Sequence, residues 1–207
     1  MMVRHPIRTL KTLFPWPDEK PQVPEQHGWW FSLKKQILLR EVVPRDAKLV
    51  VELGSWLGDS TRWFCEYCPK ATIVAVDTWL GSAEHLLRRR GVLPILYDTF
   101  LVNCWKHREQ LIPFRNTSLA ALNFLGELGL KPDVIYFDCD HSYWGLTAEL
   151  ETANSLFPSA MFIGDDYTGG RISEALADFL DRVRSNENNN FFSKVDTLHN
   201  TWHLQRV

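Results

Sequence analysis

The chain has 207 residues, 45% of them hydrophobic, and its 23 basic side chains nearly balance 25 acidic ones, for a formal net charge of −2. This length and apolar content predict one globular domain with a sizeable core and exclude a disordered chain. Nucleic-acid binding usually needs a clustered basic excess, so no nucleic-acid partner is expected. Because no apolar run approaches the roughly 18 residues of a membrane span, no membrane partner is expected either.

Residues 1–46 are expected to form an N-terminal arm and a capping helix. The opening MMVRHPIRTLKTLF is basic and free of acids, as organelle presequences are, but it has no long apolar segment, which favours an ordered arm. The stretch PWPDEKPQVP, residues 15–24, is predicted to be extended because proline fixes φ and removes a backbone donor. Apolar spacing then predicts a helix over residues 29–42.

From residue 47 to 207 the pattern indicates a single α/β domain. Strands are predicted at 49–53, 72–77, 111–116, 133–138 and 160–166, helices at 61–67, 118–129, 142–157 and 171–185, and two strands around a turn near residue 200 in the tail. Continuous apolar runs are typical of strands buried on both faces. The alternation predicts a Rossmann-like, doubly wound fold: a mostly parallel seven-stranded sheet with a C-terminal antiparallel strand pair.

The connection between the second and third strands, residues 81–110, exceeds the usual short connection. It is expected to hold two helices and to cover the active face as a lid. The cysteines are expected to stay reduced in a cytoplasmic protein. Cys65 and Cys68 form one C-x-x-C, but no second pair stands at zinc-site spacing, so helix packing is the preferred interpretation.

A glycine loop follows the first strand, in VELGSWLGDST. Gly54 and Gly58 would let backbone approach a ligand at the start of a helix; a plain tight turn is the alternative. The spacing matches neither the dinucleotide nor the Walker pattern. Glu52, just before the loop, would repel a phosphate and would suit an ammonium or a sulfonium. Asp77, which ends the second strand, could accept both hydroxyls of a ribose.

VELGSWLGDST together with IVAVDTW resembles the first two motifs of class I S-adenosylmethionine-dependent methyltransferases. The resemblance continues through DVIYFDCDHSY and FIGDDY, over residues 48–167, and is greatest to small metal-dependent O-methyltransferases, including those acting on sugars of natural products. It implies S-adenosylmethionine as cofactor. The cofactor-binding residues it implies are Glu52, Gly54, Ser55, Gly58 and Ser60 around the methionine end, Asp77 at the ribose, and Trp79 and Ser118 around the adenine.

Acidic side chains end the fourth and fifth predicted strands. Asp138, Asp165 and Asp166 should converge if these strands are neighbours in a parallel sheet. Three carboxylates cannot share a small space in ionised form without a cation, and oxygen ligands in that number suit Mg²⁺, Mn²⁺ or Ca²⁺. The resemblance also implies metal ligands at these positions. Helix capping by Asp140, Asp165 or Asp166 is the alternative.

His141, three residues beyond Asp138, is a candidate general base beside the carboxylates; Asp140 would orient its imidazole. In some sugar O-methyltransferases a histidine at this spacing has that role. A structural histidine is the alternative reading of the same residue.

Together these features predict an O-methyltransferase that acts on a hydroxyl of a small molecule, a sugar or a phenol, with Mg²⁺ as the expected cation. Aromatic side chains near the strand ends could stack on the acceptor: Trp79, Tyr143, Trp144 and Tyr167. Two alternatives stay open, a metal-dependent hydroxylase or hydrolase on the same scaffold and a non-catalytic cofactor-binding module. A homo-oligomer is also compatible with the sequence.

Overall fold

A computed structural model describes residues 5–28, 31–82, 85, 87, 90–167, 170–185, 192–198 and 200–206. The strands are β1 (Leu49–Leu53), β2 (Thr72–Asp77), β3 (Leu111–Arg115), β4 (Val134–Phe137), β5 (Met161–Gly164), β6 (Phe192–Leu198) and β7 (Thr201–Arg206). The α-helices are α1 (Pro6–Leu13), α2 (Leu33–Val42), α3 (Asp59–Tyr67), α5 (Leu96–Cys104), α6 (Ser118–Glu127), α7 (Tyr143–Leu156) and α8 (Arg171–Ser185), with 3₁₀ turns η1 (Leu93–Ile95) and η2 (Trp105–His107).

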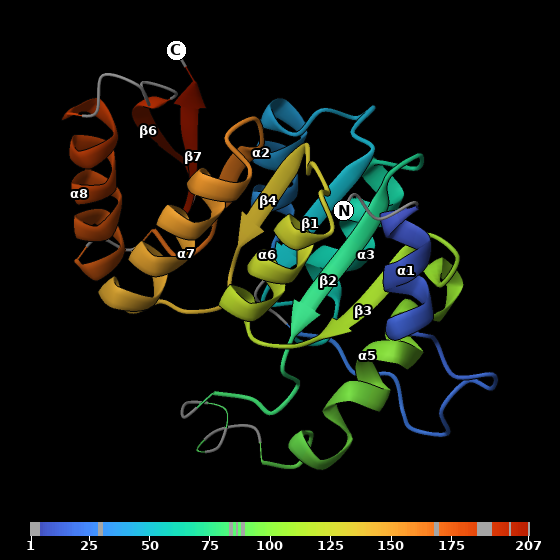
Figure 1. Ribbon diagram of the computed structural model, residues 1–207. Coiled ribbons are helices and arrows are strands. Elements are labelled where there is room, and N and C mark those ends of the chain that lie inside the picture. The colour runs from blue at the N-terminus through green and yellow to red at the C-terminus, as the bar shows by residue number, and fades with distance from the viewer. Residues whose placement is uncertain are drawn as a thin grey trace.

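The strands form one seven-stranded sheet in the order β3-β2-β1-β4-β5-β7-β6 (Figure 1). All neighbours are parallel except β7, which runs antiparallel to β5 and β6. The order reverses between β1 and β4, and in such sheets ligands bind at the carboxyl ends of the strands beside the reversal. The predicted doubly wound sheet with an antiparallel C-terminal pair is confirmed.

Helices cover both faces of the sheet, so each strand of the parallel part is buried on both sides. Helices α1, α6, α7 and α8 pack on one face, and α2, α3 and α5 pack on the other. Helix α8 shows why these segments are helical, because its buried residues recur at spacings of three and four: Ile172, Ala175, Leu176, Phe179, Leu180 and Val183. Cys65 and Cys68 are buried free thiols in the hydrophobic core on the face of the sheet that α2, α3 and α5 cover, which confirms the packing interpretation.

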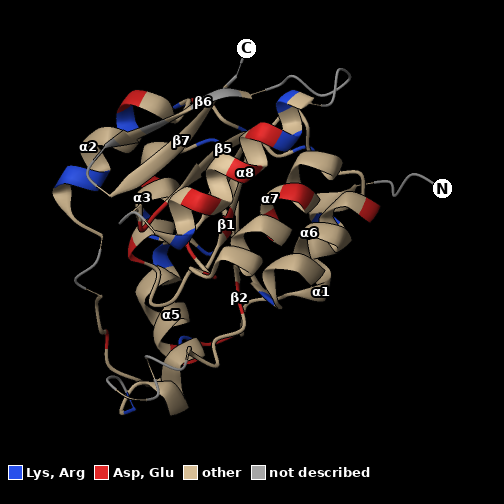
Figure 2. Cartoon of the chain, turned by 90° about the vertical axis from the view of Figure 1, so that its left-hand side faces the viewer, with Lys and Arg blue, Asp and Glu red and all other residues tan. Residues whose placement is uncertain are grey.

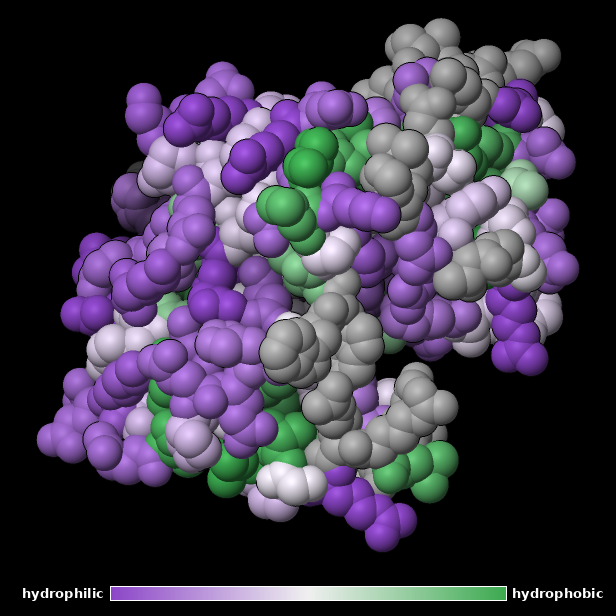
Figure 3. Space-filling model, turned by 180° about the vertical axis from the view of Figure 1, so that it is seen from behind, coloured by the Kyte–Doolittle hydropathy of each residue, from purple (hydrophilic) through white to green (hydrophobic). Residues whose placement is uncertain are grey.

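The surface is mainly polar. Basic and acidic segments are interspersed on the side drawn in Figure 2, in keeping with the near-neutral net charge. Seen from behind in Figure 3, polar groups are interrupted by small apolar areas. Within the described ranges, no helix is long and apolar enough to cross a membrane.

The N-terminal arm covers the open edge of the sheet at β3. The indole N–H of Trp16 donates to the carbonyl of Leu111 at 2.7 Å, and the rings of Phe14 and Phe114 lie 4.1 Å apart. An uncovered edge strand invites pairing with other chains, so this cover protects the sheet. The arm also contains α1, which sequence patterning did not reveal because this short helix buries only Leu10 fully.

The predicted helix over residues 29–42 begins later, at Leu33, where Ser32 caps it by accepting from the backbone N–H of Lys35. Trp29 and Trp30 lie outside the described residues.

The connection at 81–110, which was expected to cover the active face, is partly buried in the core. Its helix α5 is the β2–β3 crossover and packs in the core through Phe100, Leu101 and Cys104. In the described part of this connection lie α5 and two 3₁₀ turns, and His85 and Leu87 are also helical. Positions 83, 84, 86, 88 and 89 are outside the described residues, so the expectation of a second helix falls partly on them.

We predict that Gly58→Ala destabilises the fold more than Gly129→Ala. Both glycines have positive φ, 85° and 70°, so both variants carry the left-handed penalty of roughly 1–2 kcal/mol. A Cβ at Gly58 would lie 2.5 Å from Sγ of Cys104, whereas nothing lies within 4 Å of a Cβ at Gly129. Overpacking should therefore cost G58A roughly 1–3 kcal/mol more. Denaturant unfolding of the two variants measures the difference; equal losses would show that α5 does not press on the loop.

Candidate active site

Strand register brings three sequence segments together at the carboxyl edge of the sheet. Leu53 pairs with Phe137, and Phe137 pairs with Gly164. The next residues along the three strands, Gly54, Asp138 and Asp165, are therefore neighbours. The site lies beside the reversal of strand order, as expected for this architecture.

The glycine loop is shaped by close contacts with the protein itself. A Cβ on Gly54 would lie 2.0 Å from the backbone carbonyl oxygen of Asp138, and the corresponding space at Gly58 is filled by Cys104 and Phe100. From the sequence, both glycines were expected to let backbone approach a ligand, with a plain tight turn as the alternative. The geometry shows that the space of their missing side chains is occupied by β4 and α5, so packing requires them independently of any ligand.

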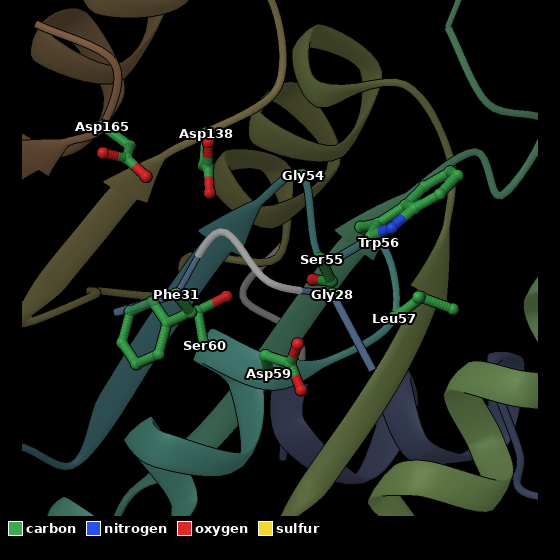
Figure 4. A pocket seen from close by; sticks show the side chains of 10 residues that line it. All are labelled: Gly28, Phe31, Gly54, Ser55, Trp56, Leu57, Asp59, Ser60, Asp138 and Asp165. Atoms are coloured by element: carbon green, nitrogen blue, oxygen red, sulfur yellow. The ribbon is translucent and has the colours of Figure 1, made fainter. Parts of the chain in front are cut away.

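A cavity that opens to solvent lies over this loop (Figure 4). It is lined by Gly28, Phe31, Gly54, Ser55, Trp56, Leu57, Asp59, Ser60, Asp138 and Asp165. Three of the predicted cofactor residues, Gly54, Ser55 and Ser60, are among them. The N-terminal segment, for which the sequence offered no motif, forms one wall through Gly28 and Phe31.

Glu52 lies behind the loop and is fully buried, with 0% of its surface exposed. Its Oε2 accepts hydrogen bonds from the hydroxyls of Ser55, at 2.8 Å, and of Thr61. Burial raises the pKa of Glu52 to about 7, and these hydroxyls oppose the rise. Its carboxylate therefore ties the loop to α3 and does not line the cavity, although sequence analysis expected it to meet the cofactor directly.

Asp77 joins the ends of β1 and β2. Its Oδ2 accepts from the backbone N–H of Trp56 at 2.9 Å, and its Oδ1 accepts from the backbone N–H of Trp79 at 2.7 Å. Burial raises the pKa of Asp77, and the two N–H donors oppose the rise. Each carboxylate oxygen can accept more than one hydrogen bond, so hydroxyls of a ribose could bind without displacing these donors.

The two residues expected around the adenine make protein contacts. Trp79 is only 2% exposed, and its indole N–H donates to the carbonyl of Trp56 at 2.9 Å. Ser118 donates to Oε1 of Glu149 at 2.5 Å, and the thiol of Cys139 donates to the same oxygen at 2.8 Å. Burial raises the pKa of Glu149 to about 7. A glutamate in the middle of a helical pattern gave no sign of this role.

The carboxylate edge brings together Asp138, His141 and Asp166, each of which offers a ligand atom within 4.8 Å of the others. Nε2 of His141 lies 3.5 Å from Asp138, and its Nδ1 lies 3.2 Å from Asp166. Asp166 has a left-handed φ of 57°, which turns its side chain out of the strand pattern. Asn200, at the β6–β7 turn, donates from Nδ2 to Oδ1 of Asp166 at 3.1 Å.

Asp165 departs from the predicted convergence of three carboxylates. Although it follows Gly164 at the strand end, its Oδ2 forms a buried ion pair with Nζ of Lys35 from α2. Its Oδ1 accepts from the backbone N–H of Asp166 at 2.8 Å. Successive residues of an extended chain point to opposite sides, and the sequence alone could not show that a lysine more than a hundred positions earlier would reach Asp165.

Asp140 does not cap α7 itself, which was the alternative role considered from the sequence, because the N-cap of this helix is Ser142. Oδ1 of Asp140 accepts from the backbone N–H of Ser142 at 2.9 Å, and Ser142 in turn caps α7 by accepting from the N–H of Gly145 at 3.0 Å. Asp140 thus fixes the backbone that carries His141. Among the described residues, the ion-pair partners of the imidazole are Asp138 and Asp166, and not Asp140 as expected from the sequence.

The charges at this edge determine the ionisation of His141. The hydrogen bond with Asp138 and the neighbouring carboxylates raise the pKa of His141 to about 9, although partial burial opposes them. Burial raises the pKa of Asp138, and His141 opposes that rise. The imidazole is thus the positive partner of Asp138 and Asp166, as Lys35 is of Asp165.

Comparison with known proteins agrees with this geometry. A family described as "Methyltransferase domain" matches residues 51–167, more than half of the chain. Among curated proteins no match is found.

Solved structures share the fold at low sequence identity. A candidate rRNA-methylase from Clostridium thermocellum has a TM-score of 0.59 at 10% identity, covering 84% of this chain and 93% of that one. A candidate O-methyltransferase from Klebsiella pneumoniae has a TM-score of 0.56 at 15% identity, covering 97% and 96%. The MycE methyltransferase of the mycinamycin biosynthetic pathway, solved with Mg and SAH, has a TM-score of 0.54 at 12% identity, covering 100% of this chain and 49% of its own.

The matched segment runs from β1 through the carboxylate edge after β5 and so contains the glycine loop, Asp77 and Asp138. The chain belongs to this methyltransferase-domain family. It is a class I methyltransferase, whose methyl donor is S-adenosylmethionine.

We predict that Glu52→Gln changes how stability depends on pH. The pKa of Glu52 is 4.5 in the unfolded chain and about 7 in the folded protein. The protonated carboxyl therefore contributes its full stabilisation of the fold below pH 4.5, and this stabilisation is lost as the pH rises through about 7. The wild type should thus lose about 3 kcal/mol of unfolding free energy relative to E52Q over that window. Denaturant unfolding at several pH values measures it, with E127Q, at an exposed position of α6, as control. A pH-independent difference would contradict the raised pKa.

Proposed function

We propose that the chain transfers the methyl group of S-adenosylmethionine to a hydroxyl of a small molecule, with a divalent cation at the carboxylate edge and His141 as the base. The observation that carries this proposal is the meeting of two features at one edge of the sheet. A cavity over the glycine loop is lined by Asp138, and Asp138 also belongs to the cluster with His141 and Asp166. Donor and acceptor sites would thus share a wall.

The cofactor would occupy the cavity over Gly54 and Ser55, with its ribose at Asp77. The cofactor supplies the methyl group on a sulfonium. Ser55 and Ser60 offer hydroxyls at the methionine end, and the carboxyl of Asp77 is held for the ribose by the N–H groups of Trp56 and Trp79. The adenine would lie beyond Asp77, toward the start of α6.

The connection 81–110 would contribute a cover at the ribose end. His85 stacks on the indole of Trp56 in the glycine loop, with ring centroids 3.7 Å apart, and Ser82 bonds to Nδ1 of His85 at 3.0 Å. Helix α5, later in the connection, is held in the core. We therefore propose that only its first half acts as the lid.

Asp77→Ala should weaken binding of S-adenosylhomocysteine at least tenfold, because hydrogen bonds to a charged group contribute roughly 1.5–3 kcal/mol each. Calorimetry on the folded variant measures the loss, and Asp98→Ala, an exposed acid on α5, is the matched control. Because Asp77 also holds the loop, thermal unfolding should accompany the titration. Unchanged affinity, or tighter binding of NAD, would refute the ribose assignment.

The donor set at the carboxylate edge fits a hard divalent cation. Ligand oxygens at roughly 2.1–2.6 Å from one ion lie at most about 4–5 Å apart, and the ligand atoms of Asp138, His141 and Asp166 lie within 4.8 Å of one another. Asp138 and Asp166 would hold the ion, with Asp165 a further ligand only if it leaves Lys35. Such a cation lowers the pKa of an acceptor hydroxyl.

His141 would remove the proton of the acceptor hydroxyl. It stands between the two carboxylates and is about half exposed, so it can reach an acceptor entering from solvent. A base must be neutral, and the two carboxylates favour the charged imidazole; a cation that neutralises them would free the ring for this role.

The acceptor would enter beside the start of α7. Trp144 there is 79% exposed and meets the ring of Tyr143 edge-on at 4.9 Å, so it offers a face to a sugar or a phenol. Trp79, also considered for this role, is buried. The near-neutral charge of the chain favours a small acceptor over RNA, although rRNA-methylase and fibrillarin structures share the fold.

Asp138→Asn and Asp166→Asn should each abolish cation-dependent methyl transfer while leaving S-adenosylhomocysteine affinity nearly unchanged, because asparagine keeps the size of the side chain and the proposed ribose contact is at Asp77 on β2. His141→Ala should keep cation binding and lose roughly 10²–10⁴ in rate, the usual contribution of a positioned base. Turnover with chelator and added Mg²⁺, over a panel of sugars and phenols, measures both. Full transfer with chelator present would refute the cation, and full activity of H141A would refute the base.

A further inference from the structure

A buried lysine from the N-terminal segment reaches the carboxylate edge. Lys35 is 8% exposed, whereas its neighbour Lys34 on α2 is exposed to solvent. The aliphatic stem of Lys35 runs into the protein, and its Nζ forms an ion pair with Asp165, which is 5% exposed. Lysine is rarely buried unless its ammonium is paired, so the buried position of Lys35 depends on its ion pair with Asp165.

The backbone at the end of β5 separates two adjacent carboxylates. Asp165 turns toward α2 and Lys35, while Asp166, in its left-handed conformation, turns toward Asp138 and His141. Asn200 holds Oδ1 of Asp166 on that side. Two acids that are consecutive in sequence therefore belong to different charge clusters.

Asp165 remains close to the cation site in spite of this pairing. It lines the same cavity as Asp138, and Figure 4 shows the two carboxylates at neighbouring strand ends. The negative charge of Asp165 also raises the pKa values of both Asp138 and His141. An ammonium and a divalent cation are thus alternative positive partners for one buried carboxylate, and a buried carboxylate without a partner is costly.

We propose that Lys35 is a built-in counter-ion that holds Asp165 out of the ligand set and so weakens binding of a divalent cation by Asp138 and Asp166. This inference rests on the proposed cation site and concerns its strength. Ligand charge count tunes the affinity of carboxylate sites for hard cations over orders of magnitude. Lys35 is a positioning residue here: it acts through Asp165 and sets how many carboxylates the cation meets.

The consequence is that the N-terminal segment adjusts the active site from outside the matched family segment. Residue 35 precedes the segment that matches the methyltransferase-domain family, which begins at residue 51. The same segment lines the donor cavity through Phe31. A segment without catalytic motifs thus contributes a charge to the cation site and a wall to the cofactor site.

The test is a titration with Mn²⁺, followed by the loss of the electron paramagnetic resonance signal of the free ion, on the full chain without cofactor. Lys35→Met should bind Mn²⁺ at least about tenfold more tightly than the wild type, because it releases a third carboxylate. Lys34→Met removes an equal charge from the same helix and should leave the affinity unchanged. Lys35→Arg should keep the wild-type affinity.

Asp165 supplies the second arm. Asp165→Asn alone should alter the affinity less than about threefold, and it should cancel the gain when combined with Lys35→Met. Should K35M fold poorly, as chelator-treated thermal unfolding would show, the comparison of K35R with Lys35→Gln takes its place.

The outcomes separate this inference from the cation site itself. If D138N loses Mn²⁺ binding but K35M and K35Q bind Mn²⁺ as tightly as the wild type, the cation site is supported and the proposed role of Lys35 is wrong. Loss of wild-type binding in D165N also overturns it, since Asp165 would then be a ligand despite Lys35. If no variant binds Mn²⁺, both the inference and the cation site fail.

Discussion

The pairing of β4 with both β1 and β5 is the constraint on which the site depends. Because these strands are parallel and in register from Leu53 to Phe137 to Gly164, their carboxyl ends stop at one level. Gly54 then meets the backbone of Asp138 so closely that a side chain there would collide with its carbonyl oxygen. The donor cavity and the carboxylate edge are adjacent for this reason, and no long side chain is needed to bridge them.

Charge balance explains much of the local structure around this edge. Asp138, Asp165 and Asp166 carry three potential negative charges in a partly buried region, and His141 and Lys35 supply the positive partners. The left-handed turn at Asp166, supported by Asn200, divides the carboxylates between these partners. The edge is thus electrostatically satisfied as it stands, and a ligand cation must compete with protein groups already in place.

Buried carboxyls also hold the loops that surround the cavity. Glu52 joins the glycine loop to α3, Asp77 joins it to the end of β2, and Glu149 joins the start of α6 to the segment after β4. Each accepts hydrogen bonds from nearby hydroxyl, thiol or backbone groups, so each is a connector of segments that come together only in the fold. Such hydrogen-bonded connectors hold together segments that are distant in the sequence.

The sequence by itself determined the alternating strands and helices, the glycine loop, and the acids at the strand ends, because these follow from local periodicity and from the order of residues along one strand. It placed Asp77, Asp138, His141 and Asp166 at one edge of the sheet for the same reason. Only the tertiary structure decided which groups each acid meets. Lys35, Asn200 and Glu149 are ordinary polar residues in sequence, and a lone lysine on a helix is usually solvated. Their roles depend on contacts between distant segments, such as residue 35 with 165, which local patterns do not encode because packing, and not spacing along the chain, brings those side chains together.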